Sequence, residues 1–296
     1  MDFSLTEDQQ LLRDTATKLL ERECPPSLVR AHIDNPRAYE RLHDQATALV
    51  DLLHSDTAYP SGSRVLEVGC GVGAQTVTLA ARSPQAQFTS IDISAESIAK
   101  AKQATDAAGL TNVDYQQADI FALPFAPEFF DHVFVCFVLE HLSRPVEALR
   151  ILQRVLKRGG TVTVIEGDHG STHFHPDSAA AQMAIRCQVE LQRLAGGNAL
   201  IGRELYPRMV EAGLETVRVS PRMVYVDSSR PDLVDGFTKR TFTAMIEGIR
   251  DSAIEAGLAD PATFDAGVRD LHRTAQVDGV FCYTFFKGVG VKARRG

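Results

Sequence analysis

Several features that are common in other protein classes are scarce in this 296-residue chain. Tryptophan is absent, and the longest apolar run, residues 133–139, is too short to cross a membrane. The first ten residues are acidic and polar, unlike a secretory signal. The cysteines are scattered without a CxxC pair, which predicts a reduced, cytoplasmic protein without structural disulfides. They are Cys24, Cys70, Cys136, Cys187 and Cys282.

Positive charge is also scarce. The net charge is -7, and the longest basic run is the segment KARR at residues 292–295. Because a negative protein gains nothing from nucleic acid or from an anionic membrane surface, neither is expected as a partner. A hydrophobic fraction of 44% with 23% charged residues predicts a globular protein, built as one large domain or as a domain with appendages.

What the chain does contain is a regular alternation of short β-branched segments and amphipathic segments. Strands are expected at residues 64–69, 88–92, 113–119, 132–137 and 161–167, with helices from 74, at 95–108 and at 145–156. This alternation predicts βαβ units and a parallel sheet that carries helices on both faces. The fold class is therefore α/β, with a doubly wound, mostly parallel, Rossmann-like sheet.

The two ends of the chain depart from this rhythm. An N-terminal appendage is predicted at residues 1–35, with one helix at 4–23, and the main domain at 36–296 opens with a helix at 36–53. The main domain divides into a cofactor half, 60–170, and a substrate half, 170–296, that supplies a helical lid. In the substrate half we expect a His-rich loop at 168–176, helices at 178–194, 203–212, 231–256 and 261–277, and strands at 216–228 and 279–292.

A glycine-rich turn, VLEVGCGVG at residues 65–73, follows the first strand. Such a turn, with Asp92 ending the second strand, also fits a dinucleotide fingerprint, so a nicotinamide-dependent oxidoreductase is one alternative. Glu67 would repel a pyrophosphate but suits a positively charged ligand. Asp119 ends the third strand and can accept a hydrogen bond from the adenine amine, while Ile120 can lie on the ring. Three carboxylates without Lys or Arg in the turn indicate an adenosine that bears a positive charge.

Five motifs between about residues 60 and 170 resemble those of class I S-adenosylmethionine-dependent methyltransferases. In order they are VLEVGCGVGAQT, SIDIS, QADIFALPF, FDHVFVCFVLEHL and LKRGGTVTVIEGD. The resemblance implies a seven-stranded sheet whose last strand is antiparallel, with S-adenosylmethionine as cofactor and S-adenosylhomocysteine as product. It implies that the methionine part lies at Glu67, Gly69, Gly71 and Gly73, the ribose at Asp92, the adenine at Asp119 and Ile120, with further cofactor positions at Cys70, Ile93 and Phe137.

Histidines gather where the acceptor is expected. The resemblance places His141 near the reacting end of the cofactor, and His169 and His173 are candidates for a general base if the acceptor must lose a proton. A solvated polar loop is the alternative. These two histidines could also bind zinc or iron together with Asp168 and His175. Gly170 and Pro176 interrupt any helical face, however, so no metal is predicted.

Residues 170–296 are long enough to form a lid and an acceptor pocket, which favours a small organic acceptor over a macromolecule. Phe281, Tyr283 and Phe285 share one strand face, and they serve either as core or as pocket wall. The same two alternatives apply to Met223, Tyr225, Phe237, Phe242 and Met245. The segments VIEGDHGSTHFHP, PRMVYVDSSRP and FCYTFFKG also resemble bacterial and archaeal small-molecule methyltransferases that include the teleocidin-type C-methyltransferase group. This resemblance implies C-methylation of a largely apolar metabolite in secondary metabolism.

Residues 1–34 resemble the first helix of acyl-CoA dehydrogenases, although no flavin-binding region follows. The apolar stripe of this helix (Leu11, Leu12, Leu19 and Leu20) is too narrow to be stable alone. We therefore expect a homo-oligomer in which residues 1–34 contact a second chain, with folding back onto the same chain as the alternative. A cofactor-binding protein without catalysis is a further alternative for the whole molecule.

Overall fold

The computed structural model of the chain describes residues 49–294. The chain divides between Glu40 and Arg41 into two units, and all described residues belong to the second unit. The helix expected at 4–23 and the boundary expected near residue 35 lie outside the described residues and stay predictions. Of the helix expected at 36–53, the described part is helical at residues 49–54.

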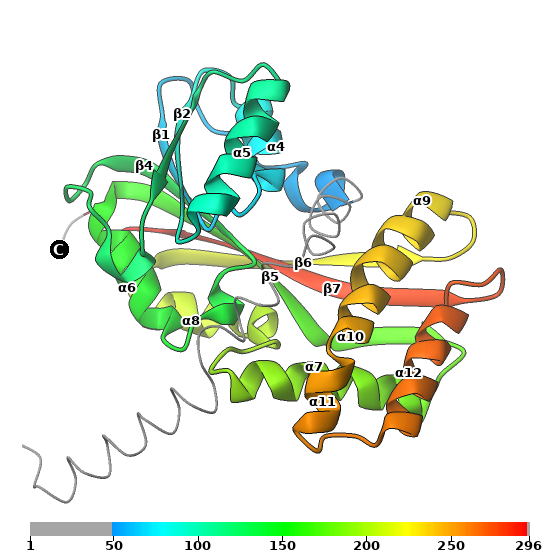
Figure 1. Cartoon of the computed structure of the whole chain (residues 1–296). Coiled ribbons are helices and arrows are strands. Elements are labelled where there is room, and N and C mark those ends of the chain that lie inside the picture. The colour runs from blue at the N-terminus through cyan, green and yellow to red at the C-terminus, as the bar shows by residue number, and fades with distance from the viewer. Residues whose placement is uncertain (1–48, 295–296) are drawn as a thin grey trace, which may run out of the picture. The chain divides into compact units, whose positions relative to one another are not determined.

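The described residues form a seven-stranded sheet with the strand order β3-β2-β1-β4-β5-β7-β6 (Figure 1). The strands are β1 (Arg64–Val68), β2 (Gln87–Asp92), β3 (Val113–Gln117), β4 (Phe130–Cys136), β5 (Leu156–His175), β6 (Glu215–Val226) and β7 (Val280–Val291). The pairs from β3 to β5 are parallel, and β7 is antiparallel to both of its neighbours. The predicted sheet, with its antiparallel last strand, is confirmed.

Helices connect these strands. They are α4 (Ala74–Arg82), α5 (Ala95–Ala107), α6 (Pro145–Val155), α7 (Ala179–Leu194), α8 (Leu205–Glu211), α9 (Pro231–Leu233), α10 (Ala244–Gly248), α11 (Arg250–Glu255) and α12 (Pro261–Arg273). Ser94, Ser178 and Asp260 each accept a hydrogen bond from a backbone N–H in the first turn of α5, α7 and α12. These side chains fix where the helices begin.

Two apolar cores cover the two faces of the sheet. On one face Val65 and Phe88 pack with Leu79 of α4. On the other face Leu66 packs with residues of α6 and α8, such as Leu149 and Met209. Burial on both faces explains why the parallel strands are almost continuously apolar in sequence.

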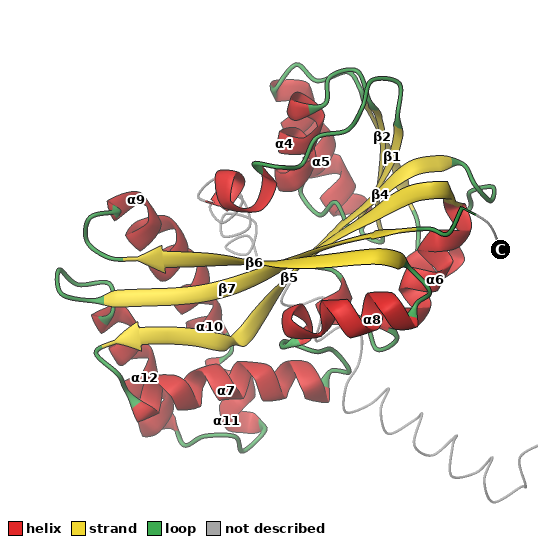
Figure 2. Ribbon diagram, turned by 180° about the vertical axis from the view of Figure 1, so that it is seen from behind, coloured by secondary structure: helices red, strands yellow, loops and turns green. Residues whose placement is uncertain are grey.

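Strands β5, β6 and β7 extend beyond the other strands as a long arm, which α7, α10, α11 and α12 accompany along one side (Figure 2). The His-rich loop expected at 168–176 is therefore wrong, because residues up to His175 belong to β5 and pair with β7. The register shifts between Asp168 and His173, a bulge that accommodates the extra residues. Pairing then resumes with His173 opposite Cys282.

The helix expected over 231–256 is divided into several segments. After α9 the chain forms a ten-residue π-helix, η4 (Val234–Thr243), before α10 and α11. Within η4 the Thr241 hydroxyl donates a hydrogen bond 2.7 Å long to the carbonyl of Gly236, five residues earlier. π-Helical turns are rare in proteins overall, but those that occur are often found at functional sites. We therefore consider this segment part of the candidate substrate side.

Candidate functional site

The glycine turn joins β1 to α4, and its glycines serve different purposes. Gly71 has a φ of 50°, and a Cβ atom added there would meet nothing within 4 Å, so this position faces open space. Gly73 has a φ of 83°, and an added Cβ would lie 2.8 Å from the Cα atom of Ala101 in α5. Gly71 therefore suits close approach of a ligand to the backbone, whereas Gly73 permits two helices to pack closely.

The predicted ribose and adenine residues lie at the ends of β2 and β3. Asp92 accepts hydrogen bonds from the backbone N–H groups of Gly71 and Ser94, both at 2.9 Å, and so ties the end of β2 to the glycine turn. Asp119 accepts from the N–H of Phe121 at 2.8 Å and caps a short 3-10 turn, η1 (Ile120–Ala122). Beside Asp92, Ile93 is 59% exposed, an apolar surface on which a flat ring can lie.

Glu67 lies underneath the glycine turn and not in the open. Its side chain is buried, and its Oε2 accepts a hydrogen bond 2.6 Å long from the Ser90 hydroxyl. Burial raises the pKa of Glu67 to about 7, with a further contribution from the charge of Asp92. Near neutral pH the Glu67 carboxyl can therefore change its charge when a cation arrives nearby.

The turn after β4 is held in an unusual conformation. Phe137 has a φ of 57°, in the left-handed region that residues with a side chain rarely adopt. Its N–H donates to the carbonyl of Ile165 at 2.9 Å. Glu166 holds the next two residues, since its Oε1 accepts from the N–H groups of Val138 at 3.0 Å and Leu139 at 2.7 Å. Glu166 is not among the residues predicted from the sequence, although a carboxylate in the apolar strand TVTVIEG could have indicated it.

This turn contacts both the cofactor side and the arm. Val138 packs directly against Gly69, and the Phe137 ring lies 5.5 Å from the Phe285 ring of β7. Fully buried Glu166 has a pKa raised well above its usual value by burial and by the neighbouring Glu140. Burial and Glu140 thus favour the neutral form of this carboxyl, while the two backbone N–H groups that it binds act in the opposite direction.

Two of the three predicted histidines are brought together by Glu140. His141 belongs to the 3-10 turn η2 (Leu139–His141), and its Nε2 lies 3.7 Å from Glu140 Oε1. His169 is buried at the register shift within β5, with Nε2 4.0 Å from Glu140 Oε2 and Nδ1 2.9 Å from the hydroxyl of Tyr283. His173 is exposed. Its neighbour Phe174 stacks on Phe281, so the His173 side chain points to the opposite face of the sheet from Phe281.

An aromatic cluster surrounds the His169–Tyr283 pair. Phe281, Tyr283 and Phe285 lie on one face of β7, where Phe237 and Phe242 of η4 pack against them. The rings of Phe242 and Tyr283 are 5.6 Å apart, and those of Tyr283 and Phe285 are 4.7 Å apart. Of the other candidates, Met245 packs against the same core, whereas Met223 and Tyr225 are exposed on the other face of β6.

The remaining polar groups of the His-rich segment are engaged elsewhere. Both carboxylate oxygens of Asp168 are bound by the guanidinium of Arg203, at 2.6 and 2.8 Å. Within residues 49–294 no group of three or more His, Cys, Asp or Glu side chains is arranged to hold a metal ion.

No helix in the same part of the chain is long and apolar enough to span a bilayer.

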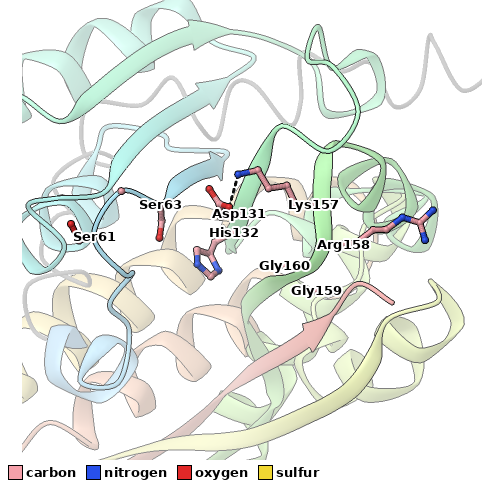
Figure 3. A pocket seen from close by; sticks show the side chains of 9 residues that line it. Ser61, Ser63, Asp131, His132, Lys157, Arg158, Gly159 and Gly160 are labelled. Atoms are coloured by element: carbon pink, nitrogen blue, oxygen red, sulfur yellow. Dashed lines mark hydrogen bonds and ion pairs between the residues drawn. The ribbon is translucent and has the colours of Figure 1, made fainter. Parts of the chain in front are cut away.

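A polar hollow of about 370 Å³ lies at the opposite edge of the sheet (Figure 3). Its walls come from the residues that begin three parallel strands, namely 61–63 before β1, 131–132 in β4 and 157–160 in β5. Lys157 reaches across the hollow to Asp131, at 2.6 Å. Ligands of open α/β sheets bind at the carboxyl ends of the strands, so this hollow is not part of the predicted site.

Known proteins resemble the chain most clearly in its cofactor half. A family model described as a methyltransferase domain matches residues 66–164. The uncharacterised 37.1 kDa protein in transposon TN4556 of Streptomyces fradiae is 30% identical over 253 residues, which cover 80% of this chain and 71% of that protein. Methyltransferase GfsG of Streptomyces halstedii is 24% identical over 241 residues, which cover 81% of this chain and 84% of GfsG.

The fold also has counterparts among solved structures. Phosphoethanolamine N-methyltransferase 2 of Haemonchus contortus, in complex with phosphomonomethylethanolamine and S-adenosylhomocysteine, gives a TM-score of 0.52 at 17% sequence identity. The match covers 84% of this chain and 53% of that one, so this chain spans about half of the length of that protein. At this identity the likeness shows the fold alone.

Proposed function

Because the chain belongs to the class I S-adenosylmethionine-dependent methyltransferases, we propose that it methylates a small, largely apolar metabolite. Membership of this family favours S-adenosylmethionine as the cofactor over a nicotinamide cofactor. It also favours an enzyme over a protein that binds the cofactor without catalysis. The observation that carries the proposal is the aromatic cluster of β7 and η4, which lies beyond the carboxyl end of β4 and alongside the second half of β5. An apolar acceptor is the ligand that would pack against such rings.

On the cofactor side we assign the methionine part to the open turn at Gly71, with Cys70 and Gly69 beside it. Asp92 would bind the ribose hydroxyls in exchange for its hydrogen bond to the Gly71 N–H. Asp119, Ile120 and Ile93 would bind the adenine, and Phe137 would face the reacting end. Gly73 contributes by helix packing, and buried Glu67 contributes by its charge.

On the acceptor side the cluster would exclude water and align the reacting atoms, which are the main demands of a direct methyl transfer. Its rings can also stabilise the sulfonium by cation–π contact. The finer assignment, C-methylation in a secondary-metabolite pathway, is supported by the resemblance of residues 164–176, 221–231 and 281–288 to the teleocidin-type group.

The test is methyl transfer itself. Purified protein is incubated with S-adenosylmethionine carrying a labelled methyl group and with the small-molecule extract of the source organism, and products are detected by mass spectrometry. A labelled apolar product that requires the protein supports the proposal, and Asp92→Ala serves as the matched control that should lose it. No labelled product, or labelled products that are all strongly polar, would refute it.

We also propose that the enzyme acts in the cytoplasm as a homo-oligomer. Cys70, Cys136, Cys187 and Cys282 are free thiols, as expected in a reducing compartment. The proposal of an oligomer is based on the apolar stripe in the sequence of residues 4–23, which lie outside the described residues. Deleting residues 1–34 should lower the mass measured by light scattering, and an unchanged mass would favour a helix that packs on its own chain.

A further inference from the structure

A chain of polar side chains leads from the aromatic cluster to the protein surface. Its inner end is the hydroxyl of Tyr283, which is 2% exposed and lies 2.9 Å from His169 Nδ1. His169 is followed by Glu140, at 4.0 Å, and Glu140 by His141, at 3.7 Å. The His141 side chain is 47% exposed, so the outer end of this chain reaches solvent.

The neighbouring groups determine which nitrogen of His169 carries a proton and which one accepts a hydrogen bond. The Glu140 carboxylate faces Nε2 of His169, which favours a proton on that nitrogen and leaves Nδ1 to accept a hydrogen bond from Tyr283. Burial lowers the pKa of His169, against the opposite effects of Glu140 and Asp168, and so favours the neutral imidazole. Gln192 of α7 donates to the Glu140 carboxylate at 3.3 Å and keeps it in place.

Both gaps around Glu140 exceed a direct hydrogen bond by about 1 Å. One carboxylate therefore lies between two imidazoles, with a different oxygen near each of them. A small rotation of the Glu140 side chain shortens one gap or the other. This arrangement suits a group that passes a proton from His169 to His141.

The π-helix η4 covers Tyr283 on the substrate side. Phe242 of η4 covers both rings of the pair, at 6.1 Å from His169 and 5.6 Å from Tyr283. The same π-helix buries the hydroxyls of Thr238 and Thr243, which have no hydrogen-bond partner within residues 49–294. Buried hydroxyls normally find a partner, so a polar acceptor group beneath η4 would supply one.

We propose that Tyr283 removes a proton from the methyl acceptor and that His169, Glu140 and His141 conduct this proton to solvent. The proposal rests on the methyl transfer proposed above and narrows its substrate class. The acceptor carries a hydrogen on the methylated atom, as in a hydroxyl, an N–H group or an acidic C–H group. Tertiary amines and thioethers, which have no such hydrogen, are not its substrates.

The step balances without any further reactant. The electron pair of the acceptor atom forms the bond to the methyl carbon, while the carbon–sulfur bond breaks and its electron pair stays on sulfur. The acceptor proton moves to the Tyr283 oxygen as the Tyr283 proton moves to His169 Nδ1. The proton on His169 Nε2 then passes to Glu140 and onward to His141 and solvent.

The first test needs no acceptor. Full-length protein labelled with ¹⁵N-histidine and saturated with S-adenosylhomocysteine is studied by NMR, with His169→Gln used to assign the His169 signals. We expect a neutral His169 with its proton on Nε2, and a shifted Nδ1 signal in Tyr283→Phe. A proton on Nδ1 would overturn the proposal, because His169 could then not accept the proton of Tyr283.

The second test follows methyl transfer to the extract used above. Tyr283→Phe should lower turnover by about 100-fold or more while leaving S-adenosylmethionine affinity unchanged. His141→Ala should lower turnover by about tenfold in dilute buffer, and added imidazole should restore it, which a purely structural role would not allow. His272→Ala, at an exposed histidine on α12, is the control and should match the wild type.

The outcomes separate the two proposals. A wild type that methylates nothing in the extract overturns the proposed function and this inference together. An active wild type whose Tyr283→Phe variant turns over normally overturns the proton path alone. Loss of activity in His141→Ala that imidazole cannot restore also contradicts the path, because the surface end would then have only a structural role.

Discussion

Replacing Glu67 by glutamine is expected to remove a pH-dependent loss of stability. The Glu67 side chain is 2% exposed, and burial raises its pKa from 4.5 to about 7. A carboxyl whose folded pKa lies above its unfolded value binds more protons in the folded state, so its ionisation destabilises the fold as the pH rises. The loss begins above pH 4.5, where the unfolded state ionises, and is complete above about pH 7, where the folded state is ionised too.

The magnitude follows from the same two pKa values. The interval from 4.5 to about 7 corresponds to roughly 3 kcal/mol, at about 1.4 kcal/mol for each pH unit. The neutral amide of Glu67→Gln avoids this loss, and its oxygen still accepts the hydrogen bond from Ser90. Urea unfolding on both sides of the interval measures the difference in free energy of unfolding between variant and wild type. Glu96→Gln, at an exposed ion pair on α5, is the control. A difference that stays flat across the interval would refute the burial argument.

Three further predictions concern the turn and the arm. Asp92→Ala should weaken S-adenosylmethionine binding by about 10- to 150-fold, measured by calorimetry, because hydrogen bonds to a carboxylate are lost. Gly71→Val should lose the cofactor, and it should lower the melting temperature less than Gly73→Val, because only the Gly73 Cβ would also meet the α5 backbone. Equal losses of melting temperature would contradict their different surroundings. Arg203→Met should cost about 3 kcal/mol in chemical denaturation by leaving buried Asp168 unpaired, and a stable variant would show that Asp168 is solvated.

Local patterns in the sequence were sufficient for the cofactor half. The alternation of strands and helices between residues 64 and 167 is confirmed, because each element there carries the local apolar pattern of its own type. The glycine turn and the carboxylates Asp92 and Asp119 are found at the carboxyl ends of β1, β2 and β3. In a parallel sheet these ends share one edge, so order along the chain already determines which side chains meet.

The substrate half depends on contacts between distant segments. The polar composition of residues 168–175 predicts a loop. They form a strand only because they pair with β7. The register shift after Asp168 then places His169 in the core and His173 in solvent. A periodic pattern cannot reveal a bulge that a partner strand imposes, so these two histidines looked equivalent in the sequence.

The proton path was determined by the tertiary structure alone. The sequence showed that Tyr283 shares a face with two phenylalanines, which fits core packing and a pocket wall equally well. His169 lies 114 positions away in the chain, and Glu140 belongs to a third segment that the strained turn at Phe137 orients. Residue type and local periodicity determined that Tyr283 lies on an apolar strand face, but they predicted a polar loop around His169 and did not single out Glu140. Which of them meet was decided by strand register and by the turn after β4, because hydrogen bonds between side chains depend on positions fixed only when distant strands pair.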